Sequence, residues 1–387
     1  TDVTIPYAPE LRQAGMITDA LWTDLNNDSL IDLLVVGEFM PVTAFVNDGK
    51  SLRLSRTTGL EKYTGWWNSL AAADFDGDGD TDYLAGNLGT NNYYHFNNET
   101  PLRVYAKDFD TNGSIDAILS CYFLSEAGTK EEYPVHFWDE LNGQSPKFRK
   151  QFSSYKKYGK ATMASLLKPH DQSGMLVLEA NFSQSAYIEN KGNTTFELRA
   201  LPSGVQVAPL NGMVVQDVNH DNQPDVLLIG NDYGNEVFSG RFDAFNGGVL
   251  LGDGKGGFTF MNACASRFEV GGDAKALIRI RTVDDRELII ASQNQDSLKA
   301  FVRRDEGDAV YFDPEVTDEW ALVEYGDGTK QRVEFYYGSG YLSQSSRSVP
   351  IPREASQMTV YNHQGKSRLI SLKQMASGAK EKGKSKP

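Results

Sequence analysis

Short apolar runs recur along the chain, and each lies next to a polar turn. The runs contain three to five residues, a length that favours strands over helices when turn residues bound them. The pattern predicts antiparallel strand pairs joined by polar loops. Runs that follow a polar stretch are 33–36, 83–85, 117–119 and 226–229, and runs that precede one include 69–73 and 212–216.

A second kind of hairpin recurs after some of these pairs. Residues 43–50, 186–196 and 248–258 each read as strand, turn and strand, with Asn-Asp-Gly, Lys-Gly-Asn or Asp-Gly-Lys-Gly at the turn. The polar loops start at positions 24, 74, 108 and 217, which suggests a repeat of about 50 residues. Two hairpins per repeat give four strands, the content of one propeller blade.

The chain therefore predicts an all-β fold, a β-propeller of six to seven four-stranded blades with a small C-terminal β module or last blade. Residues 1–312 form the propeller, with residues 1–16 adding a strand that closes the ring and 138–160 forming a helical insertion. Residues 313–376 supply further strands, and 377–387 form a disordered Lys/Gly/Ser-rich tail. The expected blades are 17–60, 66–98, 101–158, 159–205, 209–263 and 271–312.

The polar loops are acidic and share one nine-residue spacing, with oxygen-bearing side chains at positions 1, 3, 5 and 9. Position 6 is Ser29, Gly79, Gly113 or Asn222, residues that mostly tolerate a tight or left-handed turn. Position 7 offers its backbone carbonyl. The candidate ligands are Asp24, Asn26, Asp28, Leu30 and Asp32 in loop 1, Asp74, Asp76, Asp78, Asp80 and Asp82 in loop 2, Asp108, Asp110, Asn112, Ser114 and Asp116 in loop 3, and Asp217, Asn219, Asp221, Gln223 and Asp225 in loop 4.

This spacing predicts up to four Ca²⁺ sites, because Ca²⁺ takes six to eight oxygen ligands and removes the repulsion among close carboxylates. The loops contain no suitably placed His or Cys for zinc or copper. An EF-hand is excluded, since position 12 is Val35, Ala85, Leu119 or Leu228 rather than Glu. The simpler alternative for a single loop is a solvated hairpin tip. A bound cation would mainly stabilise the turn between two strands.

The overall charge follows from these loops. The 387 residues carry 38 Lys and Arg, 52 Asp and Glu and a net charge of -14, and the four loops contain 14 Asp. The acidity argues against nucleic acid as a partner, and no apolar run is long enough for a transmembrane segment. The opening Thr1-Asp2, without Met, indicates a processed chain or a piece of a longer one. Two cysteines, Cys121 and Cys264, exclude a disulfide scaffold; we expect two buried thiols, and their pairing stays open.

The loops and hairpins over 17–312 resemble the FG-GAP/VCBS repeats of integrin-like propellers. Residues 65–72 add to this likeness, and 338–346 are similar to the ASPIC/UnbV module that follows such repeats. Together they resemble large VCBS-repeat proteins of Bacteroidota, although 347–352 lacks the expected Phe-Gly-Leu-Gly. The resemblance implies an exported, extracellular or cell-surface Ca²⁺-binding propeller used for recognition or adhesion.

No catalytic motif stands out, and we expect no enzymatic activity. The Gly-rich stretch 252–257 reads as a hairpin rather than a phosphate loop, and His136 with Trp138 and Asp139 reads as a packed surface loop. Of Trp66 and Trp67, one is expected to pack between blades. The favoured interpretation is that both pack, and the alternative is that the other stacks on a sugar or peptide at the propeller face. Residues 91–94 and 231–235 are expected on one rim, where a protein or glycan ligand would bind. The alternatives are a polysaccharide lyase or hydrolase and an accessory subunit of an outer-membrane uptake complex.

Overall fold

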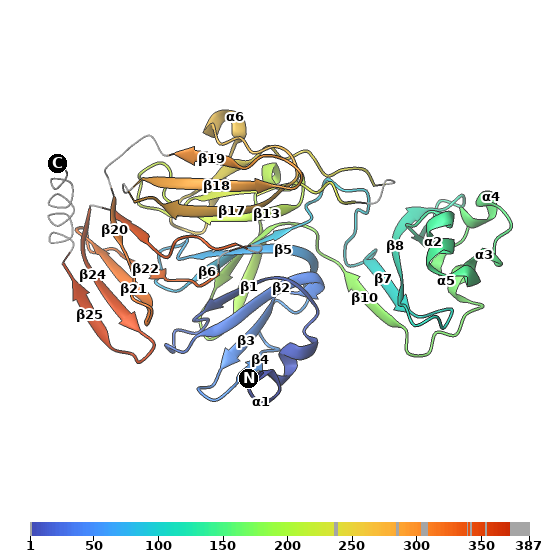
Figure 1. Ribbon diagram of the computed structural model, residues 1–387, viewed down its shortest axis with the longest axis horizontal. Coiled ribbons are helices and arrows are strands. Elements are labelled where there is room, and N and C mark those ends of the chain that lie inside the picture. The colour runs from blue at the N-terminus through green and yellow to red at the C-terminus, as the bar shows by residue number, and fades with distance from the viewer. Residues whose placement is uncertain are drawn as a thin grey trace.

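The fold of this chain is all-β and propeller-like (Figure 1). The computed structural model describes residues 2–235, 239–283, 286–302, 309–338, 340, 343–352 and 354–371. None of the helices in these ranges combines the length and apolar character needed to cross a membrane.

Blades 1 and 2 join into one eight-stranded sheet. The far end of β2 pairs with the start of β5, so that Glu38 lies opposite Trp66 and Pro41 opposite Thr64. Blade 1 consists of β1 (Met16–Thr23), β2 (Asp32–Pro41), β3 (Thr43–Asn47) and β4 (Leu52–Leu54), and blade 2 of β5 (Thr64–Ala73), β6 (Asp82–Asn87), β11 (Ala186–Asn190) and β12 (Phe196–Ala200).

Blades 3 and 4 continue the series as separate sheets. The first strands of successive blades lie side by side, β1 next to β5, β5 next to β13 and β13 next to β17. Blade 3 consists of β13 (Leu210–Val215), β14 (Val226–Gly230), β15 (Gly248–Gly252) and β16 (Phe258–Asn262), and blade 4 of β17 (Ala274–Arg281), β18 (Glu287–Gln293) and β19 (Lys299–Val302).

The expected blades at 101–158 and 159–205 are wrong, because strand pairing divides this region differently. The third strand of blade 2, β11, pairs with β6 through Ala186 opposite Ala85, about 100 residues later in the chain. The segment between them forms its own sheet in the order β10-β7-β8-β9. This inserted sheet stands apart on the right of Figure 1. Its strands are β7 (Leu102–Lys107), β8 (Asp116–Leu124), β9 (Lys130–Pro134) and β10 (Leu176–Ala180).

The predicted helical insertion is confirmed. Four short helices pack against loop 3 around a core that includes Phe109, Leu141 and Phe148. They are α2 (Trp138–Gln144), α3 (Pro146–Arg149), α4 (Tyr155–Tyr158) and α5 (Met163–Leu167). One more short helix, α6 (Ala263–Ser266), follows blade 3, and the 3-10 turn η2 (Ser203–Val205) precedes it.

The N-terminal segment does not supply the expected strand. It forms a helical turn, α1 (Thr4–Tyr7), and a 3-10 turn, η1 (Pro9–Gln13). Leu11 and Ala14 pack on a blade 1 cluster that contains Phe45. The segment therefore covers part of the blade 1 sheet, as a terminal cap does in repeat proteins.

The C-terminal strands form a separate sheet rather than an extension of blade 4. Its strand order is β22-β21-β24-β25, and it has its own core, which includes Ala321, Met358 and Val360. The strands are β21 (Asp318–Tyr325), β22 (Lys330–Glu334), β24 (Ala355–Asn362) and β25 (Ser367–Ile370), with β20 (Ala309–Phe312) paired to β23 (Val349–Pro352) beside them. The predicted tail at 377–387, and Ser339, Tyr341 and Leu342 of the ASPIC/UnbV-like segment, lie outside the described residues.

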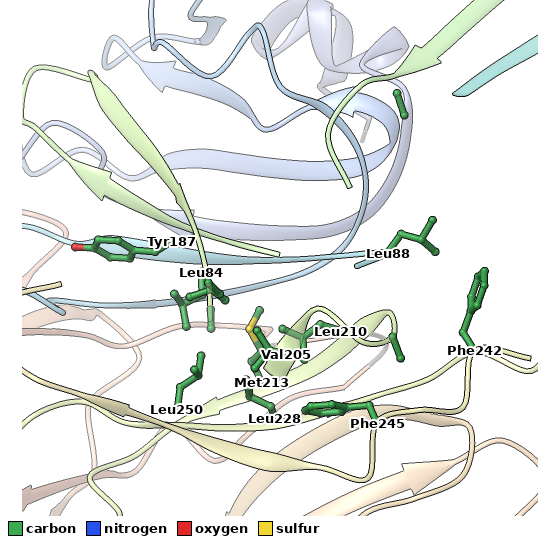
Figure 2. Packing of buried hydrophobic residues seen from close by; sticks show 14 of the residues in the cluster. Leu84, Leu88, Tyr187, Val205, Leu210, Met213, Leu228, Phe242, Phe245 and Leu250 are labelled. Carbon is green, nitrogen blue, oxygen red and sulfur yellow. The ribbon is translucent and has the colours of Figure 1, made fainter. Parts of the chain in front are cut away.

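Each interface between neighbouring blades has its own apolar core. Between blades 2 and 3, Leu84 and Tyr187 face Met213, Leu228 and Leu250 (Figure 2). Trp67 lies in the core between blades 1 and 2 and is fully buried, stacked on Phe182 at 5.8 Å between ring centroids. Burial of these faces is the main favourable contribution to folding.

Replacing Trp67 by Ala removes a whole ring from a closed interface and should lower the free energy of unfolding by about 3–5 kcal/mol. Trp22, on β1, is 46% exposed, so Trp22→Ala should cost no more than about 1 kcal/mol. Urea denaturation of both variants measures the difference. Similar losses in the two would show that the interface between blades 1 and 2 does not carry this stability.

Candidate metal loops

All four acidic loops have left-handed backbone at the same two positions. The prediction for position 6 is confirmed, since Ser29, Gly79, Gly113 and Asn222 have φ between 64° and 96°. Position 4 is also left-handed in every loop, with φ between 59° and 76° at Asn27, Gly77, Thr111 and His220. Non-glycine residues rarely adopt this conformation, so its repetition at two positions shows that the spacing specifies a defined turn.

Hydrogen bonds hold the side chains of positions 1, 3 and 5 on the inner side of this turn. In loop 3, Asp108 Oδ2 accepts the amide of Gly113 at 2.9 Å, and Asn112 Oδ1 accepts that of Ser114 at 2.7 Å. Equivalent bonds occur in loops 1 and 4. In loop 2 the position 5 bond is the same, but Asp74 Oδ1 accepts the amide of Gly77, at position 4, at 2.8 Å. These bonds turn the side chains toward their own loop, and among the described residues the carboxylates of loops 2 and 3 come closest to one another.

The aspartate at position 9 has a structural role that the sequence did not reveal. In each loop this aspartate accepts a hydrogen bond from the backbone amide of position 2, at 2.9–3.2 Å. The donors are Leu25, Phe75, Phe109 and Val218. In blades 1, 2 and 3 its other oxygen accepts an amide of the third strand, from Asn47, Asn190 or Gly252, at 2.6–2.9 Å. Asp32, Asp82 and Asp225 therefore join the loop to the outer part of the blade.

Loops 2 and 3 bring three carboxylates closest together. One oxygen from each of Asp74, Asp76 and Asp78 lies within 4.8 Å of the others, and the same holds for Asp108, Asp110 and Asp116. Asp80 Oδ1 is buried without a hydrogen-bond partner among the described residues. All these donors are oxygens, which suit Ca²⁺ better than zinc or copper. The residues therefore fit a hard divalent cation, most clearly in loop 2.

The carboxylates of loop 2 repel one another when no cation is bound. Burial, with the neighbouring Asp78 adding to it, raises the pKa of Asp80 to about 8. Burial also raises the pKa of Asp82 to about 7 and that of Asp74 to about 6. In loop 3 the backbone amide of Gly113 instead lowers the pKa of Asp108. A divalent cation would therefore relieve the most repulsion between carboxylates in loop 2.

Two side chains of the C-terminal sheet reach loops 1 and 2, and sequence analysis missed both. Arg332 Nη2 lies 3.0 Å from Asp24 Oδ2, and Arg332 is 6% exposed. Glu334 accepts the hydroxyls of Thr23 at 2.8 Å and Thr81 at 3.1 Å. Only the alternation along β22 marks these positions, and that pattern is equally typical of a solvent-facing strand.

A second charged cluster lies at the other end of the blades. Lys275 Nζ is 3.1 Å from Asp232 and 2.8 Å from Asp273, and it links blades 3 and 4. Burial, with the charge of Asp232 adding to it, raises the pKa of Glu38, and Trp66 donates to this carboxylate. We call this end of the blades the opposite rim. It contains the predicted segments 91–94 and 231–235, and Trp66 stacks there on Tyr94 at 6.4 Å.

The remaining sequence predictions have clear outcomes. The Gly-rich stretch 252–257 is the β15–β16 hairpin. Trp66 is partly buried, whereas Trp67 is fully buried. His136 Nε2 accepts the amide of Leu119 at 3.1 Å, as expected of a packed loop. Cys121 is buried and Cys264 is exposed, and both are free, so the expectation of two buried thiols is wrong for Cys264.

The pKa values predict how stability changes with pH in calcium-free buffer. Because burial raises the pKa of Asp80 to about 8, the folded protein binds a proton that the unfolded chain releases near pH 4. Its stabilising effect is complete below that pH and is lost as the pH rises toward 8. We expect Asp80→Asn to lessen the fall in melting temperature between pH 5 and 8. Asp108→Asn should leave the fall unchanged, and equal slopes for Asp80→Asn and the parent protein would contradict the assignment.

Comparison with known families agrees with this geometry over part of the chain. Residues 24–85 match the family model described as FG-GAP-like repeat. The match begins at the first residue of loop 1 and ends within β6, so it covers loops 1 and 2, which Arg332 and Glu334 contact. No curated protein is significantly similar to the chain. Residues 24–85 of this all-β, propeller-like chain thus resemble an FG-GAP repeat.

Proposed function

We propose that the chain is a calcium-binding extracellular β-propeller that acts as a recognition or adhesion module, with up to four Ca²⁺ ions stabilising its hairpin loops. The observation that carries this proposal is the common backbone of the four loops, each with left-handed residues at positions 4 and 6. Oxygen side chains gathered inside such a turn suit a calcium ion. The fit is best in loop 2, where Asp80 Oδ1 is buried without a partner.

The calcium would act mainly on stability. In loops 1, 2 and 4 the position 9 aspartate connects the turn to the third strand, so a cation held by the same turn would stiffen the connection between inner and outer strands. Binding to the folded state alone adds about 2.7 kcal/mol per site when free Ca²⁺ is 100 times its Kd. This is a structural role and requires no catalytic group.

We propose the opposite rim as the ligand-binding face, with a protein or a glycan as the ligand. Aromatic side chains are present there, including Trp66 and Tyr93, and Tyr93 is 44% exposed. Aromatic rings at such a face contact sugars or peptides with little loss of side-chain entropy. An exported or cell-surface location is a further part of this proposal and rests on the FG-GAP resemblance, and a role as accessory subunit of an outer-membrane uptake complex stays an alternative.

A polysaccharide lyase or hydrolase is the second candidate, and the charged cluster of the opposite rim favours it. Glu38 and Asp232 are close enough for one charge to affect the other, and Lys275 is held beside Asp232. A carboxyl group with a raised pKa is suited to general acid chemistry. The double ion pair of Lys275 also serves as a tie between blades, which is why we place this function second.

Removing calcium should lower the melting temperature, and adding Ca²⁺ back should restore it. Asp78→Asn removes a loop 2 ligand and should reduce the gain that calcium gives. Asp48→Asn is the matched control, since Asp48 accepts amides in a hairpin turn of blade 1 outside the four loops. Differential scanning fluorimetry in EDTA and in Ca²⁺ measures both. A melting temperature that EDTA leaves unchanged in calcium-loaded protein would refute the metal role.

The two candidate functions differ in what the opposite rim does to a polysaccharide. Recognition predicts binding on a glycan array that Trp66→Ala weakens about tenfold or more, with the polymer left intact. An enzyme predicts chain shortening that Glu38→Gln abolishes. Product analysis by chromatography after incubation with the bound glycan separates them, and turnover sensitive to Glu38→Gln would replace the first proposal by the second.

A further inference from the structure

The C-terminal sheet meets the propeller through two buried charges on one strand. Arg332 and Glu334, two residues apart on β22, both point toward the acidic loops of blades 1 and 2. Their side chains are 5% and 6% exposed and lie 3.3 Å apart. Buried charges need close partners, so the position of this sheet is tied to the residues that surround these two groups.

Arg332 places its guanidinium group directly on loop 1. Besides the 3.0 Å contact with Asp24 Oδ2, its Nη1 donates to Asn27 Oδ1 at 2.7 Å, and its other side lies over the Trp320 ring at 4.3 Å. Asp24 is the position 1 candidate ligand, and Asn27 is the left-handed residue at position 4. The guanidinium group thus binds the turn that would hold the cation.

Loop 3 shows what the same position looks like without this contact. The position 1 carboxylate of loop 3, Asp108, accepts the amides of Asn112 and Gly113, as Asp24 accepts those of Asp28 and Ser29. The loop geometry is therefore alike, and in loop 1 Arg332 is added to it. A calcium ion bound to Asp24 would have to share that carboxylate with a positive charge, and the two cations would repel each other.

Glu334 keeps Arg332 in place. It accepts hydroxyl hydrogen bonds from Thr23 beside loop 1 and from Thr81 inside loop 2, and it pairs with Arg332. Because these bonds come from two blades, Glu334 fixes β22 across the junction of blades 1 and 2. Arg332 cannot leave loop 1 without separating a buried ion pair or moving the strand.

We propose that the guanidinium group of Arg332 provides the positive charge of loop 1 in place of a metal ion. Docking of the C-terminal sheet and binding of Ca²⁺ at loop 1 therefore oppose each other. The calcium part of this inference rests on the proposed function. Loops 2, 3 and 4 remain the calcium sites of the docked protein. Linkage is reciprocal, so docking lowers the calcium affinity of loop 1 by some factor, and calcium bound at loop 1 lowers the equilibrium constant for docking by the same factor.

A matched pair of substitutions at position 5 tests the assignment without disturbing Arg332. Asp78→Asn in loop 2 should remove one site from a calcium titration by isothermal calorimetry, whereas Asp28→Asn in loop 1 should leave the number of sites unchanged at micromolar to submillimolar calcium. Loss of a site of similar affinity in Asp28→Asn would overturn the inference.

A second pair tests the arginine itself. Arg332→Met should strengthen calcium binding at loop 1 at least tenfold, so that one further site is seen, and Asp28→Asn in that background should remove it. Lys330→Met is the control, since Lys330 lies on the same strand but pairs with Glu324 at the surface. If Arg332→Met fails to fold, the Asp28→Asn titration still tests whether loop 1 binds calcium in the docked protein.

Hydrogen exchange tests the reverse effect, that of calcium at loop 1 on docking of the C-terminal sheet. In the full chain, millimolar Ca²⁺ should increase amide exchange in β21 and β22 as loop 1 fills, and Asp28→Asn should abolish that increase. Unchanged or slower exchange in the parent protein would overturn the inference. Calcium binding at none of the loops, in any variant, would refute the proposed function and this inference together, whereas loss of a site in Asp28→Asn would refute the inference alone.

Discussion

The structure depends most on the aspartate that ends each acidic loop. In blades 1, 2 and 3 this residue accepts one amide from the start of its own loop and one from the third strand, and it is completely buried. Two charge-assisted hydrogen bonds compensate part of the cost of burying the carboxylate. The inner hairpin and the outer strands of a blade are thereby joined at one point, which explains why the acidic loop and the second hairpin recur together.

The same constraint explains how blade 2 tolerates a long insertion. The third strand of this blade begins at Ala186, about 100 residues after β6 ends, yet Asn190 still donates to Asp82. Tyr187 adds its hydroxyl to the same carboxylate at 2.7 Å. The insertion lies at the end of the blade that is remote from the acidic loops, where a connection of any length leaves the joint intact. Blade 2 therefore keeps its register while the chain forms an entire sheet and four helices in between.

The parts of this structure that sequence analysis predicted are those that local chemistry determines. The nine-residue spacing needs left-handed backbone at position 6, and Gly, Ser or Asn at that position shows it directly. The apolar runs beside each loop form strands, because short apolar runs bounded by turn residues favour strands over helices. Assignment of strands to blades failed at 101–205 because β10 and β11 are alike in length and character. Only pairing across the fold sends β10 to β7 and β11 to β6.

The contact between the C-terminal sheet and the loops could not be predicted for a related reason. Lys330, Arg332 and Glu334 alternate along one strand, as charged residues do on many exposed strands, yet Lys330 is solvent-exposed and the other two are buried. What distinguishes Arg332 is the carboxylate that faces it from a loop about 300 residues earlier. A buried acid of the loops is compensated by backbone amides, by a guanidinium group or by a bound proton, as the raised pKa of Asp80 shows. The 14 Asp of the four loops are compatible with folding because hydrogen bonds from backbone amides recur in every loop, and Arg332 adds a guanidinium group at loop 1.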